Sequence, residues 1–279
     1  KPNSIELDSN SIISVNTISL HPYCLIKKNP QMTVDFKICP QIWDAASFFN
    51  SLPEGMFTSL PGFKASGKLR FFLNLSLDMS QIDSLIFNAA LTSEEFRIHG
   101  YGIDDYRMLN NEFIYSFYDK GELIASFPVG LSNPYFVPLD QISPWLKISV
   151  LTSEDGSFFH HRGFNQKAIR ESLITNIKRG RFVRGGSTIS MQLVKNVFLT
   201  RNKTIARKLE ELLIVWIIEQ NRLVSKDRMF EIYLNIIEWG PGVFGIGQAS
   251  KFYFGKNPSE LNLQESIFLA GIIPFPKRY

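Results

Sequence analysis

A pair of adjacent carboxylates is the first feature of the sequence that could do acid–base chemistry. In the stretch SEDGSFFHHRG, Glu154 and Asp155 stand close to two phenylalanines, Phe158 and Phe159. A carboxyl group near apolar rings gains proton affinity, so either acid could serve as a general acid or base near neutral pH. The alternative for a lone Glu-Asp pair is an exposed turn or helix cap, and taken by themselves these residues favour that alternative.

A second acidic pair, Glu210 and Glu211, begins the largely apolar stretch EELLIVWII. Arg207 precedes Glu211 by one helical turn, so these two side chains could form an ion pair on a helix surface. Periodicity does not choose between the two glutamates, because apolar residues flank both.

A glycine-rich loop, RGGSTISMQLVKN, lies between the two acidic pairs. Its glycines would let backbone N–H groups approach an anion closely, and Ser187 and Thr188 add hydroxyl donors. A helix that starts within MQLVKN would present its positive end to the same ligand. Nearby cations that could add formal charge are Lys195, Lys203, Arg207 and Lys208. The pattern suits a phosphate or diphosphate but lacks the GxxxxGK[ST] order of a nucleotide P-loop, and an ordinary turn with a helix cap is the alternative.

Composition indicates a globular chain of 279 residues, 44% hydrophobic and 20% charged. A net charge of +4 is too small to indicate nucleic-acid binding, and no nucleic-acid partner is expected. Cys24 and Cys39 are too few for a disulfide framework and wrongly spaced for zinc, which leaves either one disulfide or two unrelated thiols. The run LLIVWII is too short to span a bilayer and predicts a buried helix. Because the chain begins with Lys1 rather than methionine, we expect a membrane anchor upstream.

The elements that would position these groups divide the chain in two. Alternating apolar residues predict strands at MTVDFKI, GKLRFFLNLSLDM, EFIYSFY and ELIASF, and the last two are joined by a DKG turn. After the proline-containing connector NPYFVPLDQISP, helical patterns follow in IARKLEELLIVWIIEQNRL, SKDRMFEIYLNII and LNLQESIFLAGII. The sequence therefore predicts an α+β chain, with a β-rich accessory domain at residues 1–130 and a mostly α-helical domain at residues 131–279.

The helical part resembles the peptidoglycan glycosyltransferases of glycosyltransferase family 51. This is the transglycosylase domain of class A penicillin-binding proteins and of monofunctional biosynthetic transglycosylases. The resemblance runs from about Val137 to Tyr279 and rests on five stretches in the family's order: SEDGSFFHHRG, RGGSTISMQLVKN, RKLEE, SKDRMFEIYLN and GIGQASKFYFGK. It implies a lysozyme-like helical fold for this part of the chain.

The resemblance also implies roles for individual residues. Glu154 matches the general base, with Asp155 beside it in the substrate site, and Glu211 rather than Glu210 matches the glutamate of the RKxxE motif. The other residues that the resemblance implies in binding the diphosphate and the sugar are Ser187, Thr188, Gln192, Lys195, Asn196, Lys203, Arg207 and Lys208.

The reaction implied by the resemblance is polymerisation of lipid II with inversion and release of undecaprenyl diphosphate. The lipid-linked glycan would be the donor and lipid II the acceptor. Glu211 would hold the cations in place, or hold Mg²⁺ or another divalent cation on the diphosphate, although the family needs no obligatory cofactor. The implied location is the periplasmic face of the bacterial inner membrane, in contact with the membrane surface. The first half of the chain could bind other cell-wall synthesis or envelope proteins.

Three positions depart from the family's pattern. Ser190 and Met191 replace the Thr and the first Gln of GGSTITQQL, and Asn165 stands where an Asp is usual. Ser190 keeps a hydroxyl, whereas Met191 loses an amide. Met191 and Asn165 together leave open a non-catalytic scaffold that binds lipid II. A glycan-cleaving enzyme is a further alternative, because two carboxylates in a lysozyme-like core can also hydrolyse a glycoside. The loop and its cations argue against cleavage, since a neutral glycan requires neither.

Overall fold

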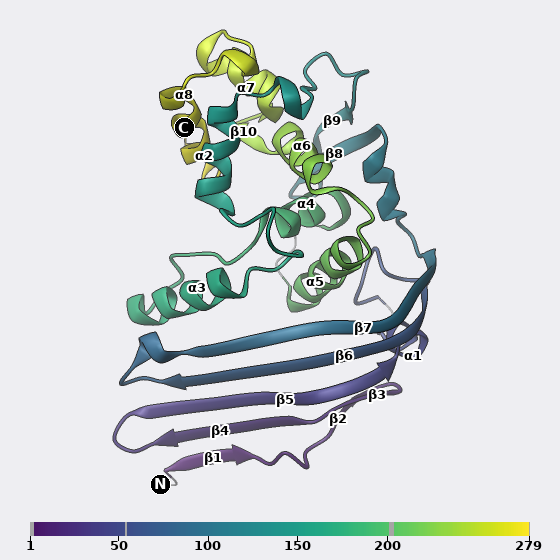
Figure 1. The fold of residues 1–279 in the computed structure, drawn as a ribbon, viewed down its shortest axis with the longest axis vertical. Helices are drawn as coiled ribbons and strands as arrows, with labels where there is room; N and C mark the ends of the chain where they lie inside the picture. Colours follow the sequence, from purple (N-terminus) through teal and green to yellow (C-terminus); the bar gives the residue numbers. More distant parts are fainter. Residues whose placement is uncertain (1–2, 54, 201–203, 279) are drawn as a thin grey trace. The chain divides into compact units, whose positions relative to one another are not determined.

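The computed structural model of the chain describes residues 3–53, 55–200 and 204–278 (Figure 1). Helices and strands are both abundant, which confirms the predicted α+β class. The chain forms two compact units, one from residues 1–104 and 165–187 and the other from residues 105–164 and 188–279. Residues 105–130 therefore group with the helical part. The functional boundary expected at residue 130 stays a prediction, because a compact unit need not coincide with a functional domain.

The first unit is built on a five-stranded antiparallel sheet in the order β1-β4-β5-β6-β7, with β1 and β7 at its edges (Figure 1). Its strands are β1 (Ser4–Leu7), β4 (Pro22–Lys28), β5 (Met32–Asp44), β6 (Phe63–Asp78) and β7 (Ile86–Tyr101). The register pairs Val34 with Leu77 and Phe36 with Leu75, so the alternating apolar residues share one face as the sequence predicted.

Shorter elements complete this unit. They are β2 (Ile13–Val15), β3 (Ile18–Leu20), α1 (Ala45–Asn50), the 3₁₀ helix η1 (Ile82–Ser84) and α3 (Gln166–Arg179). Helix α3 begins at the cap Asn165, which accepts from the N–H of Ala168, and it ends at Gly180 with φ of +60°. Arg170 of α3 donates to the carbonyl of Leu85 at 2.6 Å, which ties the helix to the start of β7. Both cysteines are free thiols.

The second unit is mostly helical. Its helices are α2 (Pro144–Glu154), α4 (Ile189–Phe198), α5 (Ile205–Gln220), α6 (Lys226–Ile236), α7 (Gly245–Phe254) and α8 (Leu263–Ile272). Its strands are β8 (Phe113–Asp119), β9 (Glu122–Val129), β10 (Glu238–Gly240) and β11 (Val243–Phe244), and its 3₁₀ helices are η2 (Tyr106–Asn110), η3 (Leu139–Gln141), η4 (Pro258–Glu260) and η5 (Pro276–Arg278). Strands β8 and β9 pair as the hairpin that the DKG turn predicted.

The core of the second unit lies around α5 and α6. Trp216, Phe230 and Tyr233 are buried there, because α5 and α6 each pack their apolar residues against α4. Ser225 caps α6 by accepting from the N–H of Arg228 at 3.2 Å, as predicted. Within the described ranges, no helix combines the length and the apolar character that crossing a membrane requires. The buried helix predicted from LLIVWII is confirmed as the middle of α5.

Candidate active site

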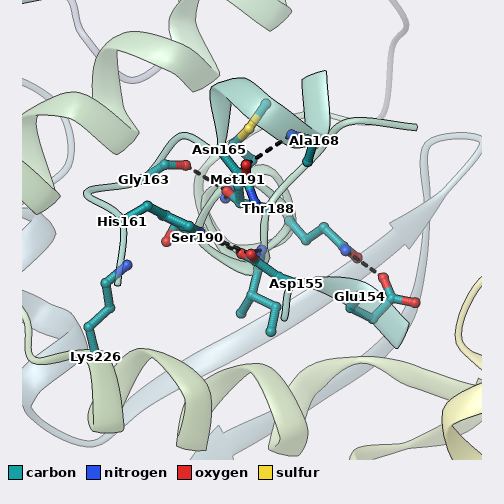
Figure 2. A network of polar contacts seen from close by, with 12 residues as sticks. Glu154, Asp155, His161, Gly163, Asn165, Ala168, Thr188, Ser190, Met191 and Lys226 are labelled. Carbon is teal, nitrogen blue, oxygen red and sulfur yellow. Dashed lines mark hydrogen bonds and ion pairs between the residues drawn. The ribbon is translucent and has the colours of Figure 1, made fainter. Parts of the chain in front are cut away.

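Glu154 is the last residue of α2, and its carboxylate bonds to a side chain of another helix of the second unit (Figure 2). Its Oε2 atom accepts a hydrogen bond of 2.8 Å from the side-chain amide of Gln192 on α4. The Gln192 carbonyl oxygen in turn accepts from the hydroxyl of Tyr233 on α6 at 3.2 Å. Two successive side-chain hydrogen bonds thus connect Glu154 on α2 to α4 and α6.

The surroundings of Glu154 favour its protonated form more than water does. Burial raises the pKa of the Glu154 carboxyl, and the neighbouring Asp155 carboxylate adds to the rise. The hydrogen bond from Gln192 and the positive charge of Lys195 oppose it without cancelling it. A carboxylate with a raised pKa is a stronger base than an exposed one, so this group is suited to take a proton near neutral pH.

Helix α4 presents two different faces. Its buried side includes Met191, Leu193 and Val194, which pack into the core. Gln192, Lys195 and Asn196 are half-buried and share the other face, because residues three and four apart lie on one side of a helix. The spacing QxxKN therefore brings an amide, an ammonium and a second amide together on the face that carries Gln192 towards Glu154.

Acceptors of the protein itself bind backbone N–H groups at the start of α4. Thr188 caps the helix, accepting from the N–H of Met191 at 3.2 Å, while its hydroxyl donates to the carbonyl of Gly163 at 2.7 Å (Figure 2). The N–H of Ile189 donates to Asp155 at 3.1 Å. Thr188 is only 2% exposed. These contacts do not support the phosphate expected at this helix end, which stays a prediction.

Asp155 faces the protein interior. It is 6% exposed, and its two carboxylate oxygens lie 3.0 Å and 2.9 Å from Nε2 of His161 (Figure 2). The other ring nitrogen of His161, Nδ1, is buried without a hydrogen-bond partner. Asp155 therefore connects the loop after α2 to the first turn of α4, and in this arrangement it makes its contacts with protein groups.

Glu211 is the centre of a basic cluster on α5. Its oxygens accept from Arg207 at 2.9 Å and from Lys208 at 2.5 Å, and Glu211 itself is 2% exposed. Glu210 is equally buried, so burial does not separate the two glutamates. Glu211 forms ion pairs with Arg207 and Lys208, as the role implied for the RKxxE glutamate requires. Both oxygens of Glu211 are engaged by cations, which favours holding those cations over binding a divalent metal.

The remaining predicted residues are dispersed. Ser187 is exposed and belongs to the first unit, and Lys203 lies outside the described residues. Of the departures from the family pattern, Met191 is buried in the core and Ser190 donates its hydroxyl to Glu219. Asn165 keeps a capping role. Among residues 3–53, 55–200 and 204–278, no three His, Cys, Asp or Glu side chains gather closely enough to hold a metal ion.

Sequence reasoning missed Glu219 as a site residue. It lies near the end of α5, is buried, and accepts from Lys226 at 2.6 Å as well as from Ser190. The available signal was a charged residue at the end of the run LLIVWIIE, because a carboxylate on a buried helix face requires partners.

Comparison with known proteins places residues 120–279 in a family. The transglycosylase family model matches residues 120–279. A biosynthetic peptidoglycan transglycosylase of Dechloromonas aromatica is 43% identical over 158 residues, which cover 57% of this chain and 68% of that protein. Proteins of the same name from Chromobacterium violaceum and Nitrosomonas eutropha are 47% and 49% identical over 144 residues, or 52% of this chain. The chain spans 62% and 58% of their lengths. The chain therefore belongs to the transglycosylase family, the peptidoglycan glycosyltransferases that its five motifs resemble.

Proposed function

We propose that the protein polymerises lipid II into glycan strands, with Glu154 as the general base. The observation that carries this proposal is the environment of Glu154, where burial raises the pKa and Gln192 of the second motif orients the carboxylate. Glu154 takes the proton of the acceptor's 4-hydroxyl as that oxygen attacks the donor's anomeric carbon. The new glycosidic bond forms, the bond from the anomeric carbon to the diphosphate oxygen breaks, and undecaprenyl diphosphate leaves.

The departing diphosphate requires positive charge, and α4 and α5 supply it. Lys195 lies on the α4 face that carries Gln192, and Arg207 and Lys208 lie on α5, which packs against α4. Cations that are already in place when charge develops on the leaving group stabilise the transition state without reorganising. Glu211 would orient Arg207 and Lys208 for this task, since it accepts a hydrogen bond from each.

Asp155 would support the site without touching the substrate, by holding His161 and the start of α4 in place.

The structure around the positions that depart from the family pattern bears on the alternative of a non-catalytic scaffold. Met191 and Asn165 left room for that alternative. Met191 packs in the core, where an amide would not have reached a substrate, and Asn165 caps α3. Catalysis is therefore the function that these residues support best.

Peptidoglycan synthesis takes place in the cell envelope. We propose that the protein contacts the periplasmic surface of the inner membrane. Phe182 is 80% exposed, and Arg179 and Arg181 beside it are exposed too. An exposed aromatic ring among cations suits the boundary between lipid headgroups and acyl chains. Phe158, by contrast, is buried and serves the core. The anchor upstream of Lys1 and the binding of other envelope proteins by the first unit stay proposals.

The decisive experiment follows glycan length with labelled lipid II. Wild-type protein should produce long glycan strands, and Glu154→Gln should produce none while keeping the wild-type circular dichroism spectrum. Glu122→Gln is the matched control, because Glu122 is an exposed glutamate on β9 of the same unit. Normal polymerisation by Glu154→Gln would show that another group is the base. Binding of lipid II without extension by the wild type would favour the scaffold.

A further inference from the structure

Three helices of the second unit meet at one buried carboxylate. Glu219 of α5 is 6% exposed, and its Oε1 atom accepts from the hydroxyl of Ser190 on α4 and from the ammonium of Lys226 on α6. The Ser190–Glu219 and Lys226–Glu219 distances are 2.5 Å and 2.6 Å. The ammonium of Lys226 also lies 4.3 Å from the ring centroid of Phe158, a fully buried residue in the loop after α2. We use the name clamp for Ser190, Glu219 and Lys226.

Stability alone does not explain this arrangement. Removing a carboxylate and an ammonium from water costs several kcal/mol per ion, and apolar residues of similar volume often give a fold of equal stability. A buried polar group does, however, restrict the geometry of the elements it joins, because only one arrangement satisfies all of its hydrogen bonds. The clamp therefore fixes how α4, α5 and α6 meet more strictly than apolar packing would.

The clamp acts on the part of α4 that leads to the base. Ser190 is in the first turn of α4, two residues before Gln192, whose amide donates to Glu154. Thr188 and Ile189, the two residues before Ser190, are bonded to Gly163 and Asp155. Three consecutive residues at the start of α4 are thus each fixed by a hydrogen bond to another segment. The Ser190 contact reaches Glu219 on α5 and, through it, Lys226 on α6, and these two helices also carry the basic cluster and Tyr233.

We propose that Ser190, Glu219 and Lys226 are positioning residues, which hold α4 so that Gln192 donates to Glu154 in the geometry needed for proton transfer. This inference rests on the proposed role of Glu154 as base. The groups that face Glu154 are Gln192 and Lys195 from α4, Asp155 from the loop after α2, and Tyr233 from α6. Loosening the start of α4 would change the contact between Gln192 and Glu154, while all the side chains that face Glu154 stay the same.

The test replaces the hydroxyl and leaves the buried ion pair intact. Ser190→Ala removes one bond to Glu219, whereas Glu219→Gln would leave Lys226 without its carboxylate and would test folding instead. Ser190→Thr keeps the hydroxyl and is the rescue variant. Ser250→Ala is the matched control, because Ser250 is a fully buried serine on α7 that donates to the carbonyl of Lys256. For each protein, kcat, KM and the pH profile of kcat are measured with lipid II.

We expect Ser190→Ala to lower kcat about tenfold while KM changes less than about twofold, since the positioning matters mainly in the transition state. The acidic limb of its kcat profile should move to higher pH, because a weaker bond from Gln192 stabilises the Glu154 carboxylate less. Ser190→Thr should restore both quantities, and Ser250→Ala should change neither.

Two results would overturn the proposal. In the first, Ser190→Ala keeps the kcat and the pH profile of the wild type. In the second, kcat falls in proportion to lost thermal stability, with an unmoved acidic limb and no rescue by Ser190→Thr, as a purely structural contact would behave. An inactive wild-type protein would be a different failure, since it would refute the proposed polymerase itself.

Discussion

Gly163 is the last residue of the first motif and packs against Val215 and Glu219 of α5, so replacing it by alanine tests the packing of the site. Its backbone has φ of +87°, a conformation that L side chains rarely adopt. A Cβ atom there would lie 2.5 Å from Cγ1 of Val215 and 3.2 Å from Cγ of Glu219. Its carbonyl accepts from Thr188, so a shift of this loop reaches the cap of α4.

Two costs add up in Gly163→Ala. The left-handed conformation costs a non-glycine residue about 1–2 kcal/mol. An extra methyl group forced against a close-packed side chain costs about 1–3 kcal/mol more. We therefore expect the free energy of unfolding to fall by about 3 kcal/mol, which lowers Tm by roughly 10 °C in a domain of this size. Glycan polymerisation should fall with it, because the displaced loop carries the acceptor of Thr188.

A second glycine separates the two costs. Gly255 has φ of +65°, and a Cβ atom built there meets nothing within 4 Å. Gly255→Ala should therefore show only the backbone cost of about 1–2 kcal/mol. Urea unfolding of both variants measures the difference, and Val215→Ala should make Gly163→Ala less harmful than the sum of the two single changes. Equal destabilisation by both glycine variants would mean that the contact with Val215 is absent.

Three further predictions concern the carboxylates. Glu154→Gln should lower polymerisation at least about 100-fold in the lipid II assay, as expected for loss of a general base. Because burial raises the pKa of Glu154, the folded state binds this proton more tightly than the unfolded chain does. The protonated carboxyl therefore contributes to the free energy of unfolding in full below the pKa of the unfolded chain. This contribution is lost as the pH rises through the pKa of the folded protein. Glu154→Gln should therefore be more stable than wild type at neutral pH but not at acidic pH; equal urea midpoints at pH 7 would contradict the raised pKa. Glu211→Gln should lower the free energy of unfolding by about 1–3 kcal/mol and reduce polymerisation, since Arg207 and Lys208 lose their shared charged acceptor; unchanged urea unfolding would show that the cluster contributes little.

Patterns that depend on near neighbours were predictable from the sequence. The strand faces of β5 and β6, the β8–β9 hairpin, the buried run of α5 and the cap at Ser225 follow from periodicity and local hydrogen bonding. These features require only the side chains within a few positions of each other. The ion pair between Arg207 and Glu211 belongs to the same class, because the two residues are one helical turn apart.

Partners that come from distant segments were not predictable in this way. The loop pattern RGGST suggested open donors for an anion, yet Thr188 bonds to Gly163 and the N–H of Ile189 bonds to Asp155. Nothing within a few residues of Thr188 indicates either acceptor. The partners of Glu219 were hidden for the same reason, since Ser190 lies 29 positions before it in the sequence. The local sequence indicates that a buried polar side chain needs a hydrogen-bond partner. The tertiary fold determines which residue is that partner.

The two adjacent acids show how the fold separates groups that the sequence leaves equivalent. Glu154 is the last residue of α2, where the negative end of the helix dipole disfavours a carboxylate charge, in the same direction as burial. Asp155 is turned the other way, where it accepts from the backbone N–H of Ile189 in the first turn of α4 and contacts the ring of His161. Glu154 is therefore suited to take up a proton, and Asp155 is suited to hold His161 and α4 in place. Opposite environments for neighbouring carboxylates are a general way to assign them different tasks, and here one peptide bond separates the two.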